Sequence, residues 1–227
     1  ERIVIRRGWA RATARPWNND TADVALHLHR GGHDFLARAT QTIREIHLAP
    51  VYSPALYRTG ARIWKRVGYE VFTDLQVMER SLASEIGAVP STVTEMPPDQ
   101  IERLLDVDRD SFEHFWRMSV AGMEEALRAT PRAAIFISTK AEEVTGYAIV
   151  GTQLNVSFLQ RVAVPPEHSG RGLGTALIRS SLKWARRKGA STMLLNVRST
   201  NRRATEIYAR LGFEITGTTL ELLEYKG

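Results

Sequence analysis

The chain has 227 residues, a formal net charge of +6 and no cysteine, which excludes disulfides and thiolate metal sites. It contains neither a signal-peptide pattern nor the roughly 18 apolar residues in a row that a membrane-spanning helix needs, so we expect a cytoplasmic protein outside the membrane. Its basic residues are spread out and lack interleaved aromatic residues. This argues against nucleic acid as a partner, whereas a modest positive field suits an anionic small molecule.

The upstream part, which ends at the glycine- and proline-containing stretch 86–91, gives few signals. The alternating run 24–29 predicts a strand, 35–42 a helix and 75–78 a second strand. His27 and His29 share a strand face near His33, but no carboxylate stands at ligand spacing, so we predict no metal site.

The downstream part gives a clearer order of elements. We predict strands over 91–95, 133–138, 144–151, 156–164, 193–197, 213–216 and 220–225, and helices over 98–115, 118–129, 172–188 and 201–211. An antiparallel start followed by a βαβ unit indicates an α/β (α+β) fold, with a mixed central sheet flanked by helices.

One stretch recurs at a constant offset of 144 residues. The segment from Trp64 to Glu70, with Gly68 inside it, is echoed by the segment from Tyr208 to Glu214, and a predicted strand follows both. We interpret residues 1–88 as a truncated, degenerate copy of the last third of the downstream domain, without a glycine-rich loop. A chance echo of a short helix–glycine–strand pattern is the alternative.

The sequence Ser169-Gly170-Arg171-Gly172-Leu173-Gly174 lies between a strand and an amphipathic helix. Glycines there let a backbone approach a ligand, and the free N–H groups of a first helical turn form an anion site suited to pyrophosphate. A simple tight turn is the alternative. The position late in the chain is atypical of a dinucleotide-binding fold, and the Gly-Lys-Ser/Thr of a P-loop is absent.

Asn201 and Tyr208 follow this loop in the segment 201–213. By spacing alone, Asn201 is a helix cap and Tyr208 a packing residue. Together the two motifs resemble the GNAT superfamily (GCN-five-related N-acetyltransferases) over about residues 91–225. The resemblance implies a GNAT fold for a catalytic domain at 91–227, preceded by a degenerate partial GNAT-like domain at 1–88.

The same resemblance implies where acetyl-CoA, the co-substrate, binds. The strand at 156–164 splays from the one at 193–197, and the pantetheine arm lies in the wedge, while the loop cradles the pyrophosphate. The implied cofactor-binding residues are Val162, Ala163, Val164, Ser169, Gly170, Arg171, Gly172, Leu173, Gly174, Thr175, Asn201 and Tyr208. Ser169 departs from the Gln or Arg that leads the family pattern, so we expect weaker cofactor binding.

The family places the residue equivalent to Tyr208 near the thioester sulfur, which makes Tyr208 the expected catalytic general acid for the departing thiolate. We therefore predict an N-acetyltransferase that moves an acetyl group from acetyl-CoA to a primary amine by direct attack. The amine is a protein N-terminus, a lysine or a small molecule. Glu113 and His114 are candidate bases, although solvated surface is the favoured interpretation of both.

Two alternatives stay open at this point. One is an acyl-CoA-binding regulatory or sensor protein with little turnover. The other resembles mycothiol synthase, a small-molecule acyltransferase that pairs a degenerate N-terminal GNAT domain with an active one. The sequence is also compatible with a homodimer.

Overall fold

The computed structural model describes residues 2–19 and 22–227, which form two compact units. One unit comprises Glu1–Gln76, Arg198–Thr200 and Gly217–Gly227, and the other comprises Val77–Val197 and Asn201–Thr216. The units therefore interleave along the chain. Two long strands, β6 (Tyr69–Ser81) and β12 (Glu214–Tyr225), each begin in one unit and end in the other.

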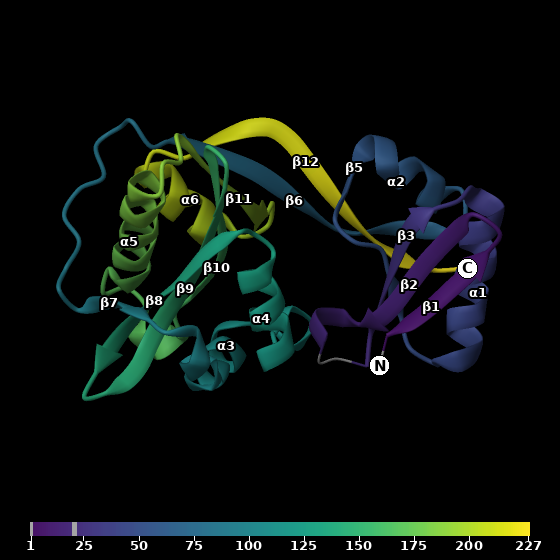
Figure 1. Ribbon diagram of the computed structural model, residues 1–227, viewed down its shortest axis with the longest axis horizontal. Coiled ribbons are helices and arrows are strands. Elements are labelled where there is room, and N and C mark those ends of the chain that lie inside the picture. Colours follow the sequence, from purple (N-terminus) through teal and green to yellow (C-terminus); the bar gives the residue numbers. More distant parts are fainter. Residues whose placement is uncertain (1, 20–21) are drawn as a thin grey trace. The chain divides into compact units, whose positions relative to one another are not determined.

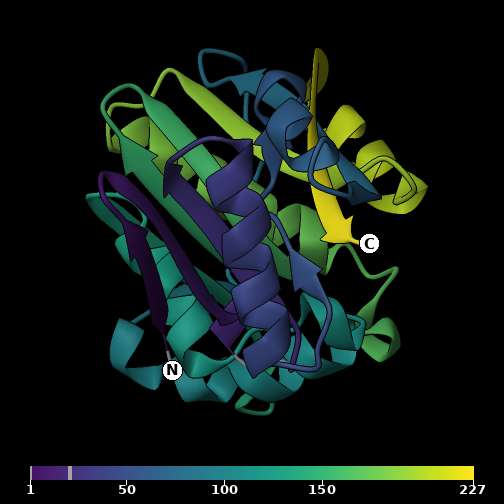
Figure 2. The same cartoon turned by 90° about the vertical axis from the view of Figure 1, so that its right-hand side faces the viewer.

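The unit that holds the N-terminal segment is built on a sheet in the order β1-β2-β3-β4-β12, with β5 also paired to β12. Helix α1 lies across these strands (Figure 2), and its buried face carries Phe35, Leu36, Ala39 and Ile43 at helical spacing. The bounds are β1 (Ile3–Arg7), β2 (Ala10–Pro16), η1 (Trp17–Asn19), β3 (Val24–Arg30), α1 (His33–Ile46), β4 (Val51–Tyr52), β5 (Leu56–Tyr57) and α2 (Arg58–Lys65).

The other unit has the strand order β6-β11-β10-β9-β8-β7. Strands β7 to β10 pair antiparallel in sequence, whereas β10 and β11 are parallel and joined by helix α5. The bounds are β7 (Val93–Met96), η2 (Pro98–Leu104), α3 (Leu105–Ser111), η3 (His114–Trp116), α4 (Val120–Arg128), β8 (Arg132–Lys140), β9 (Glu143–Gln153), β10 (Val156–Ala163), η4 (Pro166–His168), α5 (Leu173–Arg187), β11 (Thr192–Arg198) and α6 (Arg202–Arg210).

Helices cover both faces of this second sheet, with α5 on one side of β8–β10 and α3 and α4 on the other (Figure 1). Side chains alternate between the faces along each strand. Phe136 and Ala148 join the core under α5, whereas Ile135 and Tyr147 join the core under α3 and α4. A sheet buried on both faces explains why β8 and β9 are almost continuously apolar.

The structure confirms the mixed α/β class but corrects three predicted elements. One helix over 98–115 is wrong, because the chain forms the 3₁₀ turn η2, then α3, then an extended Phe112 and a second 3₁₀ turn, η3. The helix predicted from Met118 begins at Val120, where the Ser119 hydroxyl caps it by accepting from the Gly122 N–H. The two strands predicted at 213–216 and 220–225 are the single strand β12.

Four further strands, β1, β2, β4 and β5, were not predicted. The inward residues of β2 are Ala10, Ala12 and Ala14. Their small side chains give little apolar contrast with Arg11 and Thr13, which lie between them. Among the described residues, no helix combines the length and apolarity that crossing a bilayer requires.

Candidate active site

The parallel pairing of β10 and β11 stops early, and this creates the opening in which the candidate site lies. Pairs run only from Val156 with Thr192 to Phe158 with Leu194, while β10 stays paired to β9 as far as Ala163. The two strands therefore separate, as the family resemblance implies. A β-bulge on β10 falls between Leu159 and Arg161, and bulges bend and twist a strand locally.

The glycine-rich loop forms the far end of this opening. Gly170 and Gly172 have φ values of 79° and 78°, a left-handed conformation that favours glycine, and the space where each Cβ would lie is empty. Gly172 is the N-cap of α5, and the first helical hydrogen bond runs from Ala176 N–H to Gly172 C=O. The N–H groups of residues 173–175 thus have no intrahelical partner, and the helix dipole adds to their attraction for an anion.

A pocket of about 490 Å³ joins the loop, β10 and α6. Ten of the predicted cofactor-binding residues line it, namely Val162, Val164, Ser169, Gly170, Gly172, Leu173, Gly174, Thr175, Asn201 and Tyr208. Three segments of the chain, namely β10, the loop with the start of α5, and α6, therefore meet at one cavity.

Two of the predicted residues do not line the pocket. Ala163 is 1% exposed and packs in the core under α3 and α4, because it points to the face opposite Val162 and Val164. Arg171 is exposed between the two glycines and lies outside the pocket lining.

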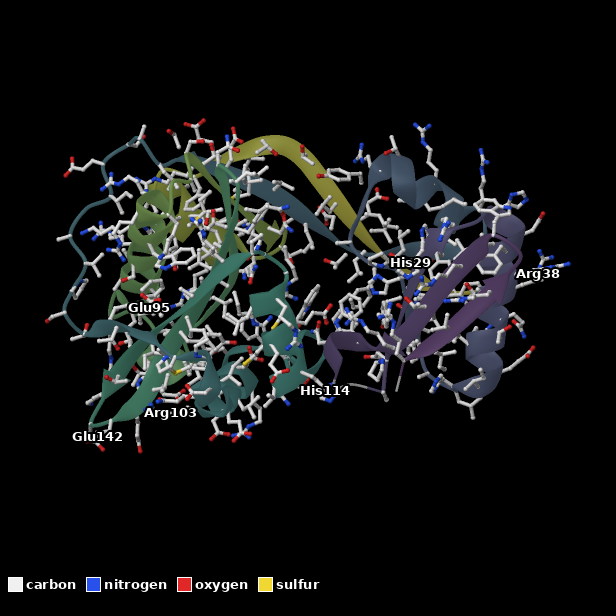
Figure 3. The ribbon with its side chains drawn as sticks, viewed as in Figure 1. His29, Arg38, Glu95, Arg103, His114 and Glu142 are labelled. Atoms are coloured by element: carbon white, nitrogen blue, oxygen red, sulfur yellow. The ribbon has the colours of Figure 1, made fainter. Side chains whose placement is uncertain are left out.

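The candidate bases are also outside the lining. Glu113 is exposed, and so is His114, which Figure 3 labels near α4. From the same segment, Ser111 and Phe112 reach the pocket instead. The sequence did not predict that these two residues face the pocket, because the predicted helix runs to residue 115 whereas α3 ends at Ser111.

Ser169 contributes less to an anion site than its position suggests. Its hydroxyl donates to the Pro165 carbonyl oxygen at 3.1 Å, and its backbone N–H donates to Pro166 C=O. The side chain's only proton is therefore already engaged within the loop. A Gln or Arg at this position would carry further donors on a longer side chain.

Asn201 caps a helix, as its spacing predicts, and also lines the pocket. Its Oδ1 accepts from the Ala204 N–H at 3.1 Å and caps α6, yet the residue also lines the pocket. Because the cap uses only the oxygen, the amide Nδ2 is free to donate elsewhere.

Tyr208 stands at the wall of the pocket with its ring against Phe213, at a centroid distance of 5.8 Å. Within the described parts of the chain, its hydroxyl has no hydrogen-bond partner. Burial raises the pKa of Tyr208 to about 12, so the phenol keeps its proton at neutral pH. A protonated, unpaired hydroxyl at this wall can act as a hydrogen-bond donor or as an acid.

A buried polar network that the sequence analysis missed supports the segment holding Phe112. Asp108 is fully buried and accepts from the Tyr147 hydroxyl, from Arg161 Nε at 2.9 Å and Nη2 at 2.6 Å, and from the Met118 N–H at 2.8 Å. Burial raises the pKa of Tyr147, which therefore remains a donor. Because all its partners are present, this buried carboxylate is stable where an isolated one would not be.

Arg161 extends this network toward the pocket. Its Nη2 also donates to the Trp116 carbonyl oxygen at 2.7 Å, and its guanidinium lies 3.5 Å from the centre of the Phe112 ring. Asp108 and Arg161 are 53 residues apart, so no local pattern could have paired them. The network fixes the chain that runs from α3 to α4 beside the pocket.

One of the histidines noted in the sequence, His29, forms a side-chain hydrogen bond within its sheet. The ring of His29, labelled in Figure 3, hydrogen-bonds through Nε2 to the Thr13 hydroxyl at 2.8 Å. Across residues 2–19 and 22–227, no three histidine, aspartate or glutamate side chains gather in a way that would hold a metal ion.

Comparisons with known proteins agree with this geometry. The Acetyltransferase (GNAT) family profile matches residues 101–213, the span that includes the loop, Asn201 and Tyr208. A mycothiol acetyltransferase of Saccharomonospora viridis is 24% identical over 229 residues, covering 90% of this chain and 74% of that protein. A [ribosomal protein bS18]-alanine N-acetyltransferase of Escherichia coli (strain K12) is 32% identical over 78 residues, covering 34% of this chain and about half (53%) of that protein.

The fold has solved counterparts as well. A tandem GNAT protein from the clavulanic acid biosynthesis pathway superposes with a TM-score of 0.65 and 16% identity, covering 97% of this chain and 81% of that one. Such a likeness over nearly the whole chain extends to the N-terminal segment and confirms a tandem GNAT-like fold. The chain therefore belongs to the GNAT acetyltransferase family and is an N-acetyltransferase.

Proposed function

We propose that the pocket binds acetyl-CoA and that the protein transfers the acetyl group directly to a primary amine. The orphan N–H groups at residues 173–175 and the left-handed glycines form an anion cradle for the pyrophosphate. The freed edge of β10 beyond Phe158 offers backbone groups to the pantetheine arm. Asn201 Nδ2 adds a side-chain donor at the same wall.

The single observation that carries this proposal is the unpaired, protonated hydroxyl of Tyr208 in the pocket that also holds the loop. The amine nitrogen forms a bond to the thioester carbonyl carbon, and the carbon–sulfur bond then breaks with its electron pair leaving on sulfur. Tyr208 donates its proton to that sulfur, while the amine gives up a proton to solvent or to a base. The products are the acetylated amine and free CoA.

The experiment is a thermal shift of the whole chain with acetyl-CoA, followed by detection of released thiol with a panel of amines and peptides. Binding of acetyl-CoA raises Tm, and thiol appears only with an accepted amine. Stabilisation without thiol release on any acceptor would instead favour the acyl-CoA-binding regulator. No stabilisation at all would contradict the cofactor assignment.

One observation favours a small-molecule acceptor over a protein N-terminus. Similarity to the mycothiol acetyltransferase extends over 90% of this chain, whereas similarity to the bS18-alanine enzyme of Escherichia coli is confined to 34%. We therefore propose that residues 1–88 form a degenerate GNAT-like domain and that residues 91–227 form the catalytic domain. The amine panel tests the class of acceptor directly, since small-molecule amines should outperform peptides that begin with alanine.

A further inference from the structure

A second cavity of about 300 Å³ lies in the same compact unit, away from the glycine-rich loop. Three arginines from three different elements line it: Arg80 at the end of β6, Arg179 in the middle of α5 and Arg210 at the end of α6. Glu85 is the single carboxylate in the lining. We call this cavity the arginine pocket, and its residues carry an excess of positive charge.

Arg80 is the most unusual of the three. The residue is only 6% exposed, and its Nη2 donates to the Glu85 carbonyl oxygen at 2.6 Å. Its Nε is buried without a hydrogen-bond partner, and no carboxylate in the described parts of the chain forms an ion pair with it. Burying a charge and a donor without partners is costly, so such groups are usually matched by a counterion or ligand.

The charges around Arg80 increase this cost. Burial, followed by the positive charges of Arg179 and Arg186, lowers the pKa of the Arg80 guanidinium. The positive charges of the neighbouring arginines repel that of Arg80. An anion bound in the pocket would offset this repulsion and so raise the pKa of Arg80 again.

Two glycines keep the guanidinium groups accessible. A Cβ on Gly212 would lie 3.3 Å from Arg80 Nε, and a Cβ on Gly87 would lie 3.0 Å from the guanidinium carbon of Arg179. Both positions are in the pocket lining, and Gly212 also has a left-handed φ of 80°. Side chains at these positions would crowd the arginines, whereas glycines leave room for an anion beside them.

We propose that the arginine pocket binds a phosphate monoester. Arginine guanidinium groups present several donors in a planar fork that matches phosphate oxygens. The site is distinct from the predicted pyrophosphate cradle, but Arg210 lines both cavities. The phosphoryl group is therefore either the 3′-phosphate of CoA or a group on a separate molecule, and only the first source depends on the function proposed above.

The first arm of the test uses inorganic phosphate alone, titrated into the whole chain at constant ionic strength. Wild type should show a saturable rise in Tm, and Arg179→Gln should weaken the apparent phosphate affinity by about tenfold or more. Arg179 is only partly buried, so this variant should fold. Arg187→Gln removes the same charge from an exposed position on the same helix and should change the affinity by less than about twofold.

The second arm compares acetyl-CoA with its 3′-dephospho form in wild type and in Arg179→Gln. If the 3′-phosphate is the ligand, wild type prefers acetyl-CoA and the preference collapses in the variant. If the ligand is a separate molecule, the preference is the same in both proteins, and phosphate still stabilises the protein saturated with acetyl-CoA. Each result identifies one source of the same phosphoryl chemistry.

One outcome would overturn the arginine pocket: equal phosphate responses in wild type, Arg179→Gln and Arg187→Gln, with an unchanged preference between the two CoA forms. A wild type that binds phosphate through Arg179 but shows no affinity for acetyl-CoA would contradict the proposed function and leave the phosphate site standing. The two failures are thus separable.

Discussion

The two compact units contain the same helix–glycine–strand motif, but the motif has different surroundings in each. Helix α2 leads through Gly68 into β6, and helix α6 leads through Gly212 into β12, with left-handed φ values of 94° and 80° at the two glycines. In each motif, an aromatic ring on the helix packs edge to face against an aromatic ring where the strand begins. The ring centroids are 4.9 Å apart for Trp64 and Tyr69, and 5.8 Å apart for Tyr208 and Phe213.

The difference lies in what surrounds the helical aromatic residue. Trp64 is 2% exposed and packs in the core of its unit, among residues of α1, α2 and β3. Tyr208 stands at the wall of a 490 Å³ pocket, because β10 and β11 separate beside it. The comparison teaches that the helix–glycine–strand motif alone is structural, and that strand separation and a glycine-rich loop turn it into a site.

The largest expected effect tests whether Trp64 stabilises the fold more than Tyr208 does. Trp64→Ala should lower the free energy of unfolding by about 3–5 kcal/mol, because it empties a packed core position. Tyr208→Ala should cost less than about 2 kcal/mol, since its ring is only partly enclosed by protein. Urea unfolding of both variants measures the difference, and equal losses would show that the two aromatic residues are equivalent after all.

The next effect concerns the loop that only one unit carries. Gly172→Ala forces a left-handed residue to carry a side chain, at a cost of about 1–2 kcal/mol, and places a methyl group at the pocket. Gly189→Ala incurs the same backbone cost beyond the other end of α5, where φ is 90° and the Cβ position is also empty. We expect similar losses of Tm, but at least about tenfold weaker acetyl-CoA binding for Gly172→Ala alone.

Calorimetric titration of acetyl-CoA into both variants supplies that measurement. If Gly189→Ala weakened binding as much as Gly172→Ala, general loss of stability would explain the result and the loop would lose its assigned role.

A smaller effect, in the opposite direction, should follow from Ser169→Gln. The serine proton is committed to Pro165, so a glutamine adds a donor that the loop now lacks. One net hydrogen bond of about 0.5–1.5 kcal/mol corresponds to acetyl-CoA binding tighter by roughly twofold to tenfold. Ser169→Ala is the control and should change the Kd by less than about twofold. An unchanged Kd in Ser169→Gln would place the cofactor away from this residue.

The smallest expected effect concerns the pH profile of kcat/KM, which should not fall near pH 10. A phenol with an ordinary pKa near 10 would lose its proton in the alkaline range. Because burial raises the pKa of Tyr208 to about 12, the donor form persists until the pH rises toward 12. We expect kcat/KM to increase from pH 7 to pH 10 as the acceptor amine becomes neutral, without a fall near pH 10. A descending limb centred near 10 would contradict the raised pKa.

The parts of the site that could be predicted from sequence are those with fixed local chemistry. Glycines at 170 and 172 are required by backbone conformation, and Asn201 by a helix start, so their roles were visible in the chain. Including Ala163 was avoidable, since strand alternation places it opposite Val162 and Val164.

Other features depend on residues brought together from afar. The Asp108–Arg161 pair and the arginine pocket each join segments separated by tens of residues, and no spacing rule relates them. Strands β1 and β2 were missed because their inward residues are small or flanked by arginines, so the period-2 pattern is faint. The break after Ser111 in the predicted helix also left no sequence signal, since Phe112 and its neighbours are compatible with a helix.

The most direct test of the central claim is a paired measurement of kcat and acetyl-CoA Kd for Tyr208→Phe, with Trp64→Phe as its counterpart in the other motif. The phenylalanine ring keeps the packing against Phe213 but removes the proton donor. We predict that kcat falls by about 10²–10⁴-fold in Tyr208→Phe while Kd stays within about twofold, and that Trp64→Phe alters neither. A Tyr208→Phe enzyme with an unchanged kcat would show that the hydroxyl does not protonate the leaving thiolate.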